Sequence, residues 1–388
     1  MPAANDSLPA RERLSLPERE RLDRLRLIRT ENVGPVTFRQ LIARYRSASA
    51  ALEALPELAR RGGRRRPLTV PTAAEADREL AANDRAGARL LVLGDSGYPL
   101  RLAATADAPA CLSVAGDPAL LVRPSVAVVG ARNASLNGVR FAGLLARTFG
   151  EAGFAVVSGL ARGIDAAAHE GSLATGTVAV LAGGIDVVYP PEHADLLRRI
   201  AESGAAVAEM PVGTVPQARH FPSRNRIIAG LSLGTVVVEA ARRSGSLITA
   251  RRALDQGREV FAVPGSPLDP RCNGCNALIQ EGAALLVQEA DDVLGVLQAI
   301  PATAPTVARA TASLQEDETG FAAVETDATA RRLILDALGP EPVPVDELIR
   351  GCQLSAPIVA TVLLEAELAG QIDRYPGNLV ARRLDAPA

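Results

Sequence analysis

Six short apolar runs rich in β-branched residues, separated by segments with helical spacing, constrain the fold of this chain more than any other feature. They lie between Ser125 and about Ala299 and comprise Val126–Val129, Ala155–Val157, Val178–Leu181, Ala206–Ala208, Val236–Val238 and Val260–Val263. A strand that is apolar at every position is buried on both faces, and strands that alternate with helices form parallel sheets. The pattern therefore predicts an α/β fold, a Rossmann-like doubly wound domain.

The segments on either side differ in composition and predict further domains, as expected for a chain of 388 residues. Gly34-Pro35 joins two short helical segments and indicates a helix-hairpin-helix or SAM-like module, whereas three helical segments and a hairpin around Pro376-Gly377 indicate a winged helix. The expected parts are a disordered 1–19, a helical N-terminal domain over 20–106, the Rossmann-like domain over 107–299, a linker over 300–327 and a winged-helix-like domain over 328–384.

Glycine and arginine recur in the segments that follow the predicted strands. Ligands of an open parallel sheet bind beyond the carboxyl ends of its strands. Glycine lets the backbone approach a phosphate, and a following helix N-terminus supplies free N–H donors. The candidate binding residues are Gly130, Ala131, Arg132, Ser158, Gly159, Leu160, Ala161, Arg162, Gly163, Gly183, Gly184, Arg219, Phe221, Arg224, Asn225, Arg226, Gly245, Ser246, Thr249 and Arg251.

Charge and cofactor patterns narrow the ligand. Arg132 stands where a dinucleotide fingerprint has its second glycine, so we expect no nicotinamide, flavin or other cofactor. All 42 basic residues are arginine, and the formal net charge is only −2, so any nucleic-acid site must be local. Phe221 lies beside Arg219 and Arg224, and an aromatic ring in a cationic groove is the basic unit of single-strand binding. Core packing of Phe221 is the alternative.

Patterns for catalysis and metal binding are weaker. Asp165 and His169 are one helical turn apart and could form a dyad, but an aspartate that stabilises the start of its own helix explains the first equally well. Cys272 and Cys275 have metal-ligand spacing, yet no second pair or histidine cluster completes a site. We expect neither an enzyme nor a metal protein.

The motifs, in this order and spacing, resemble the DprA/Smf family of DNA-processing proteins. They are Gly97–Pro99, Val128–Arg132, Ser158–Asp165, Gly183–Asp186, Phe221–Ser232, Glu239–Ala240, Gly245–Ala250 and Val263–Gly265. The resemblance implies an extended Rossmann domain that binds single-stranded DNA, forms a homodimer, and helps to load the RecA recombinase onto DNA covered by single-strand-binding protein during natural transformation. It also implies a pocket built from Gly130–Arg132, Gly159–Gly163 and Arg219–Arg226. Family members often carry lysine just before the Phe-Pro pair, where this chain has Ala218 and Arg219.

An apolar stretch after the last predicted strand is the expected dimer interface, with ordinary core packing as the alternative. Its residues are Leu278, Ile279, Leu285, Leu286 and Val287. No apolar run approaches the roughly 18 residues of a membrane span, and the N-terminus has no signal-peptide pattern. We therefore expect a cytoplasmic protein without a membrane partner.

Two other functions have some support in the sequence. The Ser232–Thr235 turn with Glu239 is similar to the motif of the phosphoribohydrolases called lysine-decarboxylase-like, but the acid lies one residue too late, which turns a strand side chain to the other face. A sequence-specific repressor would use Ser355–Leu368 as its recognition helix. That segment has acidic but no basic residues, which disfavours contact with a phosphate-lined groove.

Overall fold

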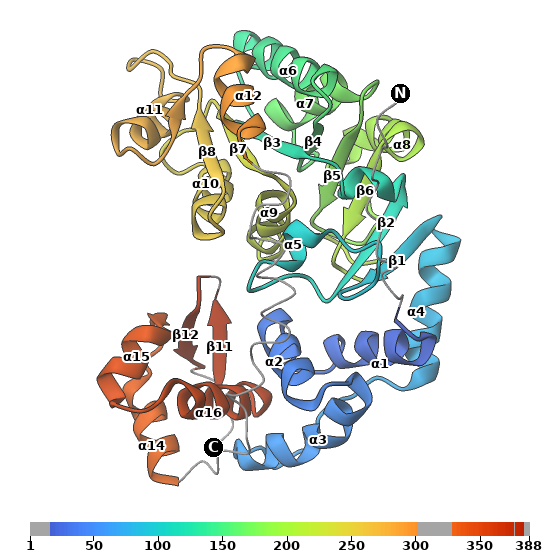
Figure 1. Cartoon of the computed structure of the whole chain (residues 1–388), viewed down its shortest axis with the longest axis vertical. Helices are drawn as coiled ribbons and strands as arrows, with labels where there is room; N and C mark the ends of the chain where they lie inside the picture. The colour runs from blue at the N-terminus through green and yellow to red at the C-terminus, as the bar shows by residue number, and fades with distance from the viewer. Residues whose placement is uncertain (1–15, 301–327, 376, 384–388) are drawn as a thin grey trace, which may run out of the picture.

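A computed structural model describes residues 16–300, 328–375 and 377–383 of the chain, which form a helical N-terminal part, a large α/β part and a small C-terminal part (Figure 1). The N-terminal helices are α1 (Glu18–Ile28), α2 (Pro35–Tyr45), α3 (Ala48–Arg61) and α4 (Ala73–Arg85). Regular structure thus begins two residues before the expected start of the helical domain at residue 20. Pro35 opens α2 at the first helical position, where a missing N–H costs nothing.

The α/β part contains one nine-stranded sheet with the order β1-β2-β6-β5-β4-β3-β7-β8-β9. The strands are β1 (Ala88–Val92), β2 (Cys111–Gly116), β3 (Ser125–Gly130), β4 (Ala155–Ser158), β5 (Thr177–Leu181), β6 (Ala205–Ala208), β7 (Gly234–Val238), β8 (Glu259–Ala262) and β9 (Leu285–Leu286). All neighbours from β6 to β9 pair in parallel. The six predicted strands are therefore confirmed, as is the doubly wound fold.

The sheet begins earlier than the sequence indicated. Strands β1 and β2 extend it antiparallel beyond β6, with Ala88 opposite Ala115 and Ser113 opposite Ala208. The α/β part therefore starts at Ala88, and the boundary expected at residue 107 is too late. Antiparallel edge strands lack the flanking crossover helices that mark a parallel strand, so the run from Ala88 to Val92 carried no comparable signal.

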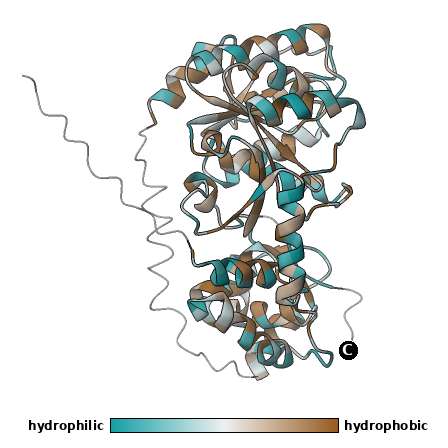
Figure 2. Ribbon diagram, turned by 90° about the vertical axis from the view of Figure 1, so that its right-hand side faces the viewer, coloured by the Kyte–Doolittle hydropathy of each residue, from teal (hydrophilic) through white to brown (hydrophobic). Residues whose placement is uncertain are grey.

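Helices cover both faces of the sheet. One face packs against α6 (Leu136–Glu151), α7 (Ile164–Ser172), α8 (Ala194–Ser203) and α12 (Ala290–Gln298); the other packs against α5 (Leu100–Ala103), α9 (His220–Leu231), α10 (Gly245–Asp255) and α11 (Asn273–Gln280). Side chains alternate between the faces along β3, so that Val126 and Val128 belong to the α6 side and Ala127 and Val129 to the α9 side. In Figure 2 the strands are coloured as hydrophobic, whereas the surrounding helices carry residues of both kinds.

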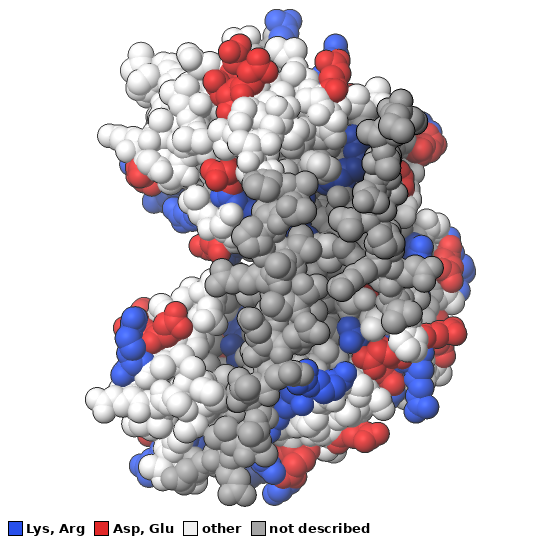
Figure 3. Space-filling model, in the orientation of Figure 1, with Lys and Arg blue, Asp and Glu red and all other residues white. Residues whose placement is uncertain are grey.

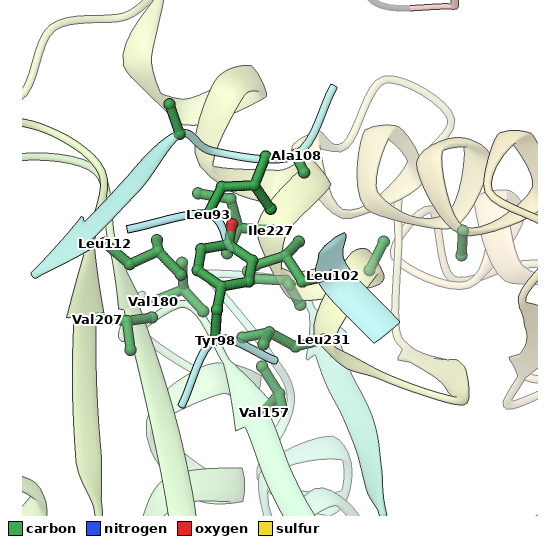
Figure 4. Close-up of a cluster of buried hydrophobic side chains, with 14 of the residues drawn as sticks. Leu93, Tyr98, Leu102, Ala108, Leu112, Val157, Val180, Val207, Ile227 and Leu231 are labelled. Atoms are coloured by element: carbon green, nitrogen blue, oxygen red, sulfur yellow. The ribbon is translucent and has the colours of Figure 1, made fainter. Parts of the chain in front are cut away.

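Tyr98, from the Gly97–Pro99 motif, anchors the segment between β1 and β2 on the α9 side of the sheet. Its side chain is only 2% exposed and lies among Leu102, Leu112 and Ile227 (Figure 4). The buried hydroxyl donates a 2.6 Å hydrogen bond to the carbonyl oxygen of Pro109, which satisfies its one polar atom. This motif is thus part of the core and not of a binding site.

The expected dimer stretch divides between core and surface. Leu278 and Val287 are 7% and 0% exposed, so these two side chains are core residues and the interface prediction is wrong for them. Ile279 is partly buried against the core. Leu285 and Leu286 form the edge strand β9 and are 48% and 45% exposed. The division arises because α11 turns Leu278 inward, whereas β9, among the strands that the structure describes, pairs only with β8.

The C-terminal part is a winged helix, as predicted. It consists of α14 (Ala328–Ala337), β10 (Val343–Pro344), α15 (Val345–Cys352), α16 (Ala356–Leu368), β11 (Ile372–Tyr375) and β12 (Leu379–Arg382), with the strand order β10-β12-β11. Residues 376 and 384–388, at the hairpin tip and the end, lie outside the described residues, as do 1–15 and 301–327 of the expected disordered terminus and linker.

Helix α16 packs against the N-terminal helices instead of facing solvent. Thr37 on α2 donates a hydrogen bond to the carboxylate of Glu367, and Asn32 donates to the carbonyl of Leu368 over 3.3 Å. Arg374 completes the buried cluster through a 2.6 Å ion pair with Glu367. The helix that a repressor would insert into a major groove is therefore covered by another domain.

No single helix among the described residues is long and apolar enough to cross a membrane. Helices α15 and α16, which are bent by 118° at the break between them, together have the length and composition of one span.

Candidate nucleic-acid interface

Two adjoining pockets lie beyond the carboxyl ends of β3, β4 and β7. The main pocket, of about 600 Å³, is enclosed by the loop after β3 and by the N-terminal ends of α9 and α10. The side pocket, of about 320 Å³, is enclosed by the turn after β4 and by Tyr189-Pro190. Arg132, Phe221 and Arg224 line both pockets, so the two form one continuous groove.

The loop after β3 places a free charge at the centre of this groove. Gly130 ends the strand, and a β-carbon there would lie 1.9 Å from the carbonyl oxygen of Val238, so the close approach requires glycine. The carbonyl of Ala131 accepts a 3.2 Å hydrogen bond from the amide of Ile164, which holds the loop. Arg132 is exposed and forms no ion pair with any described residue. Its guanidinium carbon lies 5.3 Å from the centre of the Phe221 ring.

Arg224 supplies a second positive charge beneath the turn after β4. It comes from α9, is 6% exposed, and donates a 3.1 Å hydrogen bond to the carbonyl of Val180. Burial lowers the pKa of Arg224 to about 10, while the nearby Asp165 carboxylate acts in the opposite direction. The guanidinium therefore stays charged at neutral pH and makes the floor of the groove positive.

Asp165 organises the turn above Arg224. Its carboxylate accepts hydrogen bonds from the amides of Gly159, at 3.1 Å, and Ala161, at 3.3 Å. Burial raises the pKa of Asp165, and Arg224 and these two amides oppose the rise. The carboxylate is thus committed to the turn and to the start of α7.

Asp165 and His169 do not pair with each other. His169 is fully buried, and its Nδ1 lies 2.7 Å from Oγ1 of Thr177. Burial lowers the pKa of His169 to about 3, so the ring is neutral at physiological pH. Asp165 therefore has a structural role, since it holds the turn that leads into α7, and it does not form a catalytic dyad with His169.

Phe221 and Tyr189 form an aromatic pair at the boundary of the two pockets. Their ring centres are 5.6 Å apart and their planes are inclined by 59°. Phe221 is half-buried and lines both pockets, so it belongs to the groove and not to the core. Arg132 and Arg224 both approach this ring, at 5.3 and 5.9 Å from its centre.

More than half of the residues that the sequence singled out lie in the groove. Those that line one or both pockets are Gly130, Ala131, Arg132, Gly159, Ala161, Arg162, Phe221, Arg224, Asn225, Gly245, Ser246 and Thr249. Ser158 and Leu160 are fully buried beneath the turn, where the Ser158 hydroxyl donates to the carbonyl of Val128 over 2.6 Å. Gly163 supports the loop after β3, because a β-carbon there would lie 2.4 Å from the carbonyl oxygen of Ala131.

Arg226 is the clearest error among the predicted residues. It is 5% exposed, and its Nη2 lies 2.6 Å from both carboxylate oxygens of Glu209. Two positions along a helix correspond to a rotation of roughly 200°, so Arg226 faces away from the side of α9 that carries Arg224. It braces α9 against the strand β6 region and is not available to a ligand.

Four further predicted residues lie outside both pockets. Gly183 and Gly184 are covered by the loop after β6, where β-carbons would lie 2.5 Å from the carbonyl oxygen of Thr214 and 2.6 Å from that of Pro211. Arg219 is the exposed residue before α9, and Arg251 lies on an exposed side of α10, one half-turn beyond Thr249. The rule that favours residues after strands does not say which side of the following helix meets the groove.

The groove also contains residues that were not among the candidate binding residues. They are Val129, Asn133, Asp165, Tyr189, Pro190, Pro222, Ile228, Ala241, Arg243, Ser244, Ile248 and Arg271. Arg243 follows β7 and could have been found with the same rule that identified Arg132. Arg271 is held by a 2.7 Å ion pair with Asp269.

Glu239 and the two neighbouring cysteines lie outside the groove. The Glu239 carboxylate accepts hydrogen bonds from the amide of Ser135, at 2.8 Å, and from the Ser135 hydroxyl, so it occupies the N-terminal end of α6. Cys272 and Cys275 are buried free thiols, and no cluster of three or more metal-ligating side chains occurs in residues 16–300, 328–375 and 377–383.

Known proteins share this architecture. Residues 89–298 match the family model of DNA recombination-mediator protein A, 18–82 match the DprA-like N-terminal HHH domain, and 318–378 match the DprA winged helix domain. Protein Smf of Escherichia coli is 42% identical over 291 residues, which is 74% of this chain and 75% of the relative.

Two solved structures are also similar. The X-ray structure of DNA processing protein A from Streptococcus pneumoniae has a TM-score of 0.59 and 36% identity, and covers 73% of this chain and 98% of its own. DNA processing protein A from Helicobacter pylori, whose structure concerns its single-stranded DNA binding mode, has a TM-score of 0.51 and 27% identity, and covers 55% of this chain and 97% of its own.

Proposed function

Because this chain belongs to the DprA/Smf family of DNA recombination mediators, we propose that it binds single-stranded DNA in the groove formed by the main and side pockets. The observation that carries the proposal is the arrangement of Arg132 and Tyr189 around the Phe221 ring. Aromatic faces accept bases and guanidinium groups accept phosphates, which is the combination that single-strand-binding proteins use. The Helicobacter pylori relative, which binds single-stranded DNA, supports the assignment.

Arg132 is the principal phosphate contact. It is exposed, it is free of ion pairs among the described residues, and it follows a glycine that lets the backbone come close to a ligand. A guanidinium can donate two parallel hydrogen bonds to one phosphate. Arg224 adds a buried positive charge below the groove, which the nearby Asp165 carboxylate partly offsets.

The groove recognises the strand without reading base edges. Asn225, a buried asparagine that lines the main pocket, is held by a 3.3 Å hydrogen bond from its amide to the carbonyl of Gly245 and is not free to turn toward a base edge. The Phe221 face can stack on any base. A paired base presents its faces only to its neighbours in the duplex, so this contact favours single strands over duplex DNA.

The site is proposed to bind without catalysis. Asp165 is committed to the turn after β4, and Glu239 is committed to the start of α6. In a nucleotide-hydrolysing enzyme of related fold, the helix N-terminus would receive a phosphate. Here the Glu239 carboxylate occupies the N-terminal end of α6, which disfavours the phosphoribohydrolase alternative. Release of free base from nucleoside monophosphates would support that alternative instead.

The site must attract DNA locally, because the formal net charge of the whole chain is only −2. On the face in Figure 3, arginine and acidic side chains both occur, in scattered groups among uncharged residues. A titration of the full chain with single-stranded and duplex oligonucleotides at two salt concentrations tests the function. We expect tighter binding of the single strand without added nucleotide. Preference for duplex, or a requirement for ATP, would contradict the proposal.

The wider role is proposed from family membership. The bound strand would be protected and passed to RecA, with single-strand-binding protein as a further partner, in recombination during natural transformation in the cytoplasm. A homodimer formed through the exposed edge strand β9 would present two grooves to one strand. Tethering two sites in this way raises the apparent affinity without new contacts.

A further inference from the structure

Tyr189 is an exposed aromatic side chain with a fixed position beside the groove. Its ring is 45% exposed and lies in the segment between β5 and α8, far in sequence from its neighbour Phe221. Exposed tyrosine is expected to be mobile unless its backbone is held. Here two contacts hold it.

Both contacts join the Tyr189 segment to the turn after β4. Nδ1 of His193 lies 2.9 Å from the carbonyl oxygen of Leu160, and the carboxylate of Glu192 pairs with Arg162. Leu160 is itself fully buried. The His193 contact does not involve Arg162, so it still holds the Tyr189 segment when a ligand takes Arg162 from Glu192. Binding therefore does not have to order the Tyr189 ring.

Arg162 lies beside Tyr189 in the side pocket, as Arg132 lies beside Phe221. Its side chain is 65% exposed and that of its partner Glu192 is 44% exposed. An exposed pair of this kind contributes little to stability, so a phosphate can replace Glu192 at small cost. The side pocket thus contains an aromatic face and an available cation.

We propose that Tyr189 and Arg162 form a second nucleotide subsite next to the one at Phe221 and Arg132. This inference rests on the proposed binding of single-stranded DNA. Because the two rings are inclined by 59°, two successive bases stacked on them cannot remain stacked on each other. The DNA strand must therefore unstack one base step. The free-energy cost of this unstacking is lower between thymines than between adenines, because thymines stack more weakly. The groove consequently favours thymine-rich strands through stacking strength and not through base-edge recognition.

The test measures the affinity of the full chain for oligothymidine and oligoadenosine deoxynucleotides of equal length. Tyr189→Leu removes the ring, Tyr189→Phe keeps it without the hydroxyl, and Tyr375→Leu is a matched control because Tyr375 is 42% exposed on the wing. We expect the parent to favour oligothymidine. Tyr189→Leu should bind it roughly tenfold more weakly and show a smaller preference, whereas Tyr189→Phe and Tyr375→Leu should match the parent.

Tyrosine fluorescence provides a second readout, because the chain has four tyrosines and no tryptophan. Stacking of a base on Tyr189 should quench part of the emission in the parent and in Tyr375→Leu. That part should be missing in Tyr189→Phe although its affinity is retained. Glu192→Gln should tighten binding by a few-fold, since it frees Arg162 and removes a negative charge.

The outcomes separate this inference from the proposed function. If the parent binds oligothymidine but Tyr189→Leu binds it equally well, the second subsite is wrong and the function stands. An equal loss in Tyr189→Phe and Tyr189→Leu would show that the hydroxyl acts instead of the ring, and would also overturn the inference. If Glu192→Gln binds single-stranded DNA no more tightly than the parent, Arg162 is not part of the subsite. A parent that binds neither oligonucleotide would overturn the proposed function, and this inference with it.

Discussion

Gly159 and Arg224 are packed so closely that a β-carbon at position 159 would lie 1.6 Å from Nη1 of Arg224. The turn after β4 and the guanidinium under it therefore have matching shapes, and the charge below the groove depends on the absence of a side chain above it. Gly159→Ala should displace Arg224 or the turn, with a loss of about 1 to 3 kcal/mol in the free energy of unfolding. It should also weaken single-stranded DNA binding.

Chemical denaturation and a binding titration of Gly159→Ala measure both effects. Gly295→Ala is the control, because nothing lies within 4 Å of a β-carbon at that position on α12. It should bind as the parent does. A Gly159→Ala variant with parental stability and affinity would show that the contact with Arg224 has no role.

Arg226→Ala should damage stability far more than binding. The substitution leaves Glu209 without its bidentate partner in a site where that carboxylate is 14% exposed. Breaking a buried ion pair on one side costs about 3 to 5 kcal/mol. Urea unfolding measures the loss, and the affinity for single-stranded DNA should be close to parental at a temperature where the variant is folded. An Arg226→Ala variant that is as stable as the parent but fails to bind single-stranded DNA would show that Arg226 contacts the DNA.

His169 should make the protein sensitive to acid. Burial holds its pKa at about 3 in the folded protein, against an ordinary value of 6.5. Below about pH 6.5 the unfolded chain binds a proton at this position that the folded protein does not. Unfolding is thereby favoured by about 1.4 kcal/mol per pH unit until the folded pKa is reached.

Urea unfolding of the parent and of His169→Gln between pH 4 and pH 8 measures this contribution. The difference between the two proteins should be constant above pH 7 and should shift in favour of the variant as the pH falls. Parallel curves over the whole range would contradict the assignment of a neutral, buried His169.

Most of the fold could be predicted from local sequence patterns. Buried parallel strands are apolar at every position, and the winged helix combines helical spacing with a Pro-Gly hairpin, so both were visible in the sequence. Strands β1 and β2 were not, because β1 pairs with β2, and β2 joins the sheet only through β6, which is far away in the sequence. Their apolar residues resemble those of a short core helix until the partner strand is known.

The sequence predicted a groove residue correctly where that residue follows its strand directly, as Arg132 does. The prediction failed where the position of a side chain depends on a partner that is distant in the sequence. Arg226 has the same local surroundings as Arg224, but its contacts with Glu209, 17 residues earlier, and with Asp107 hold it away from the groove. Tyr189 reaches Phe221 because the fold brings the ends of β5 and β6 together, which no spacing in the sequence expresses.

Dimerisation should occur through the free edge of β9. Within the described residues this strand pairs only with β8, and its two leucines are nearly half exposed. Leu286→Asp should therefore convert a dimer into a monomer in equilibrium sedimentation at micromolar concentration. Leu268→Asp is the control, because Leu268 is 93% exposed in a loop and its change should leave the dimer intact. A parent that sediments as a monomer would contradict this interface.

The effect of Arg132→Ala on DNA binding measures how much the charge after β3 contributes to holding the DNA backbone. Arg242→Ala is the matched control, since Arg242 is exposed and lines neither pocket, whereas its neighbour Arg243 lines the main pocket and should share part of the effect. Single-stranded DNA affinity would be measured at several salt concentrations, with the melting temperature of each variant as a check on folding.

Loss of a charge-assisted contact in a partly enclosed site should weaken binding roughly ten- to a hundredfold, or about 1.5 to 3 kcal/mol. The slope of log affinity against log salt should fall by about 0.7, the value for one phosphate of a single strand. Arg242→Ala should change neither quantity. If Arg132→Ala binds as tightly as the parent with the same salt slope, the DNA lies elsewhere on the molecule.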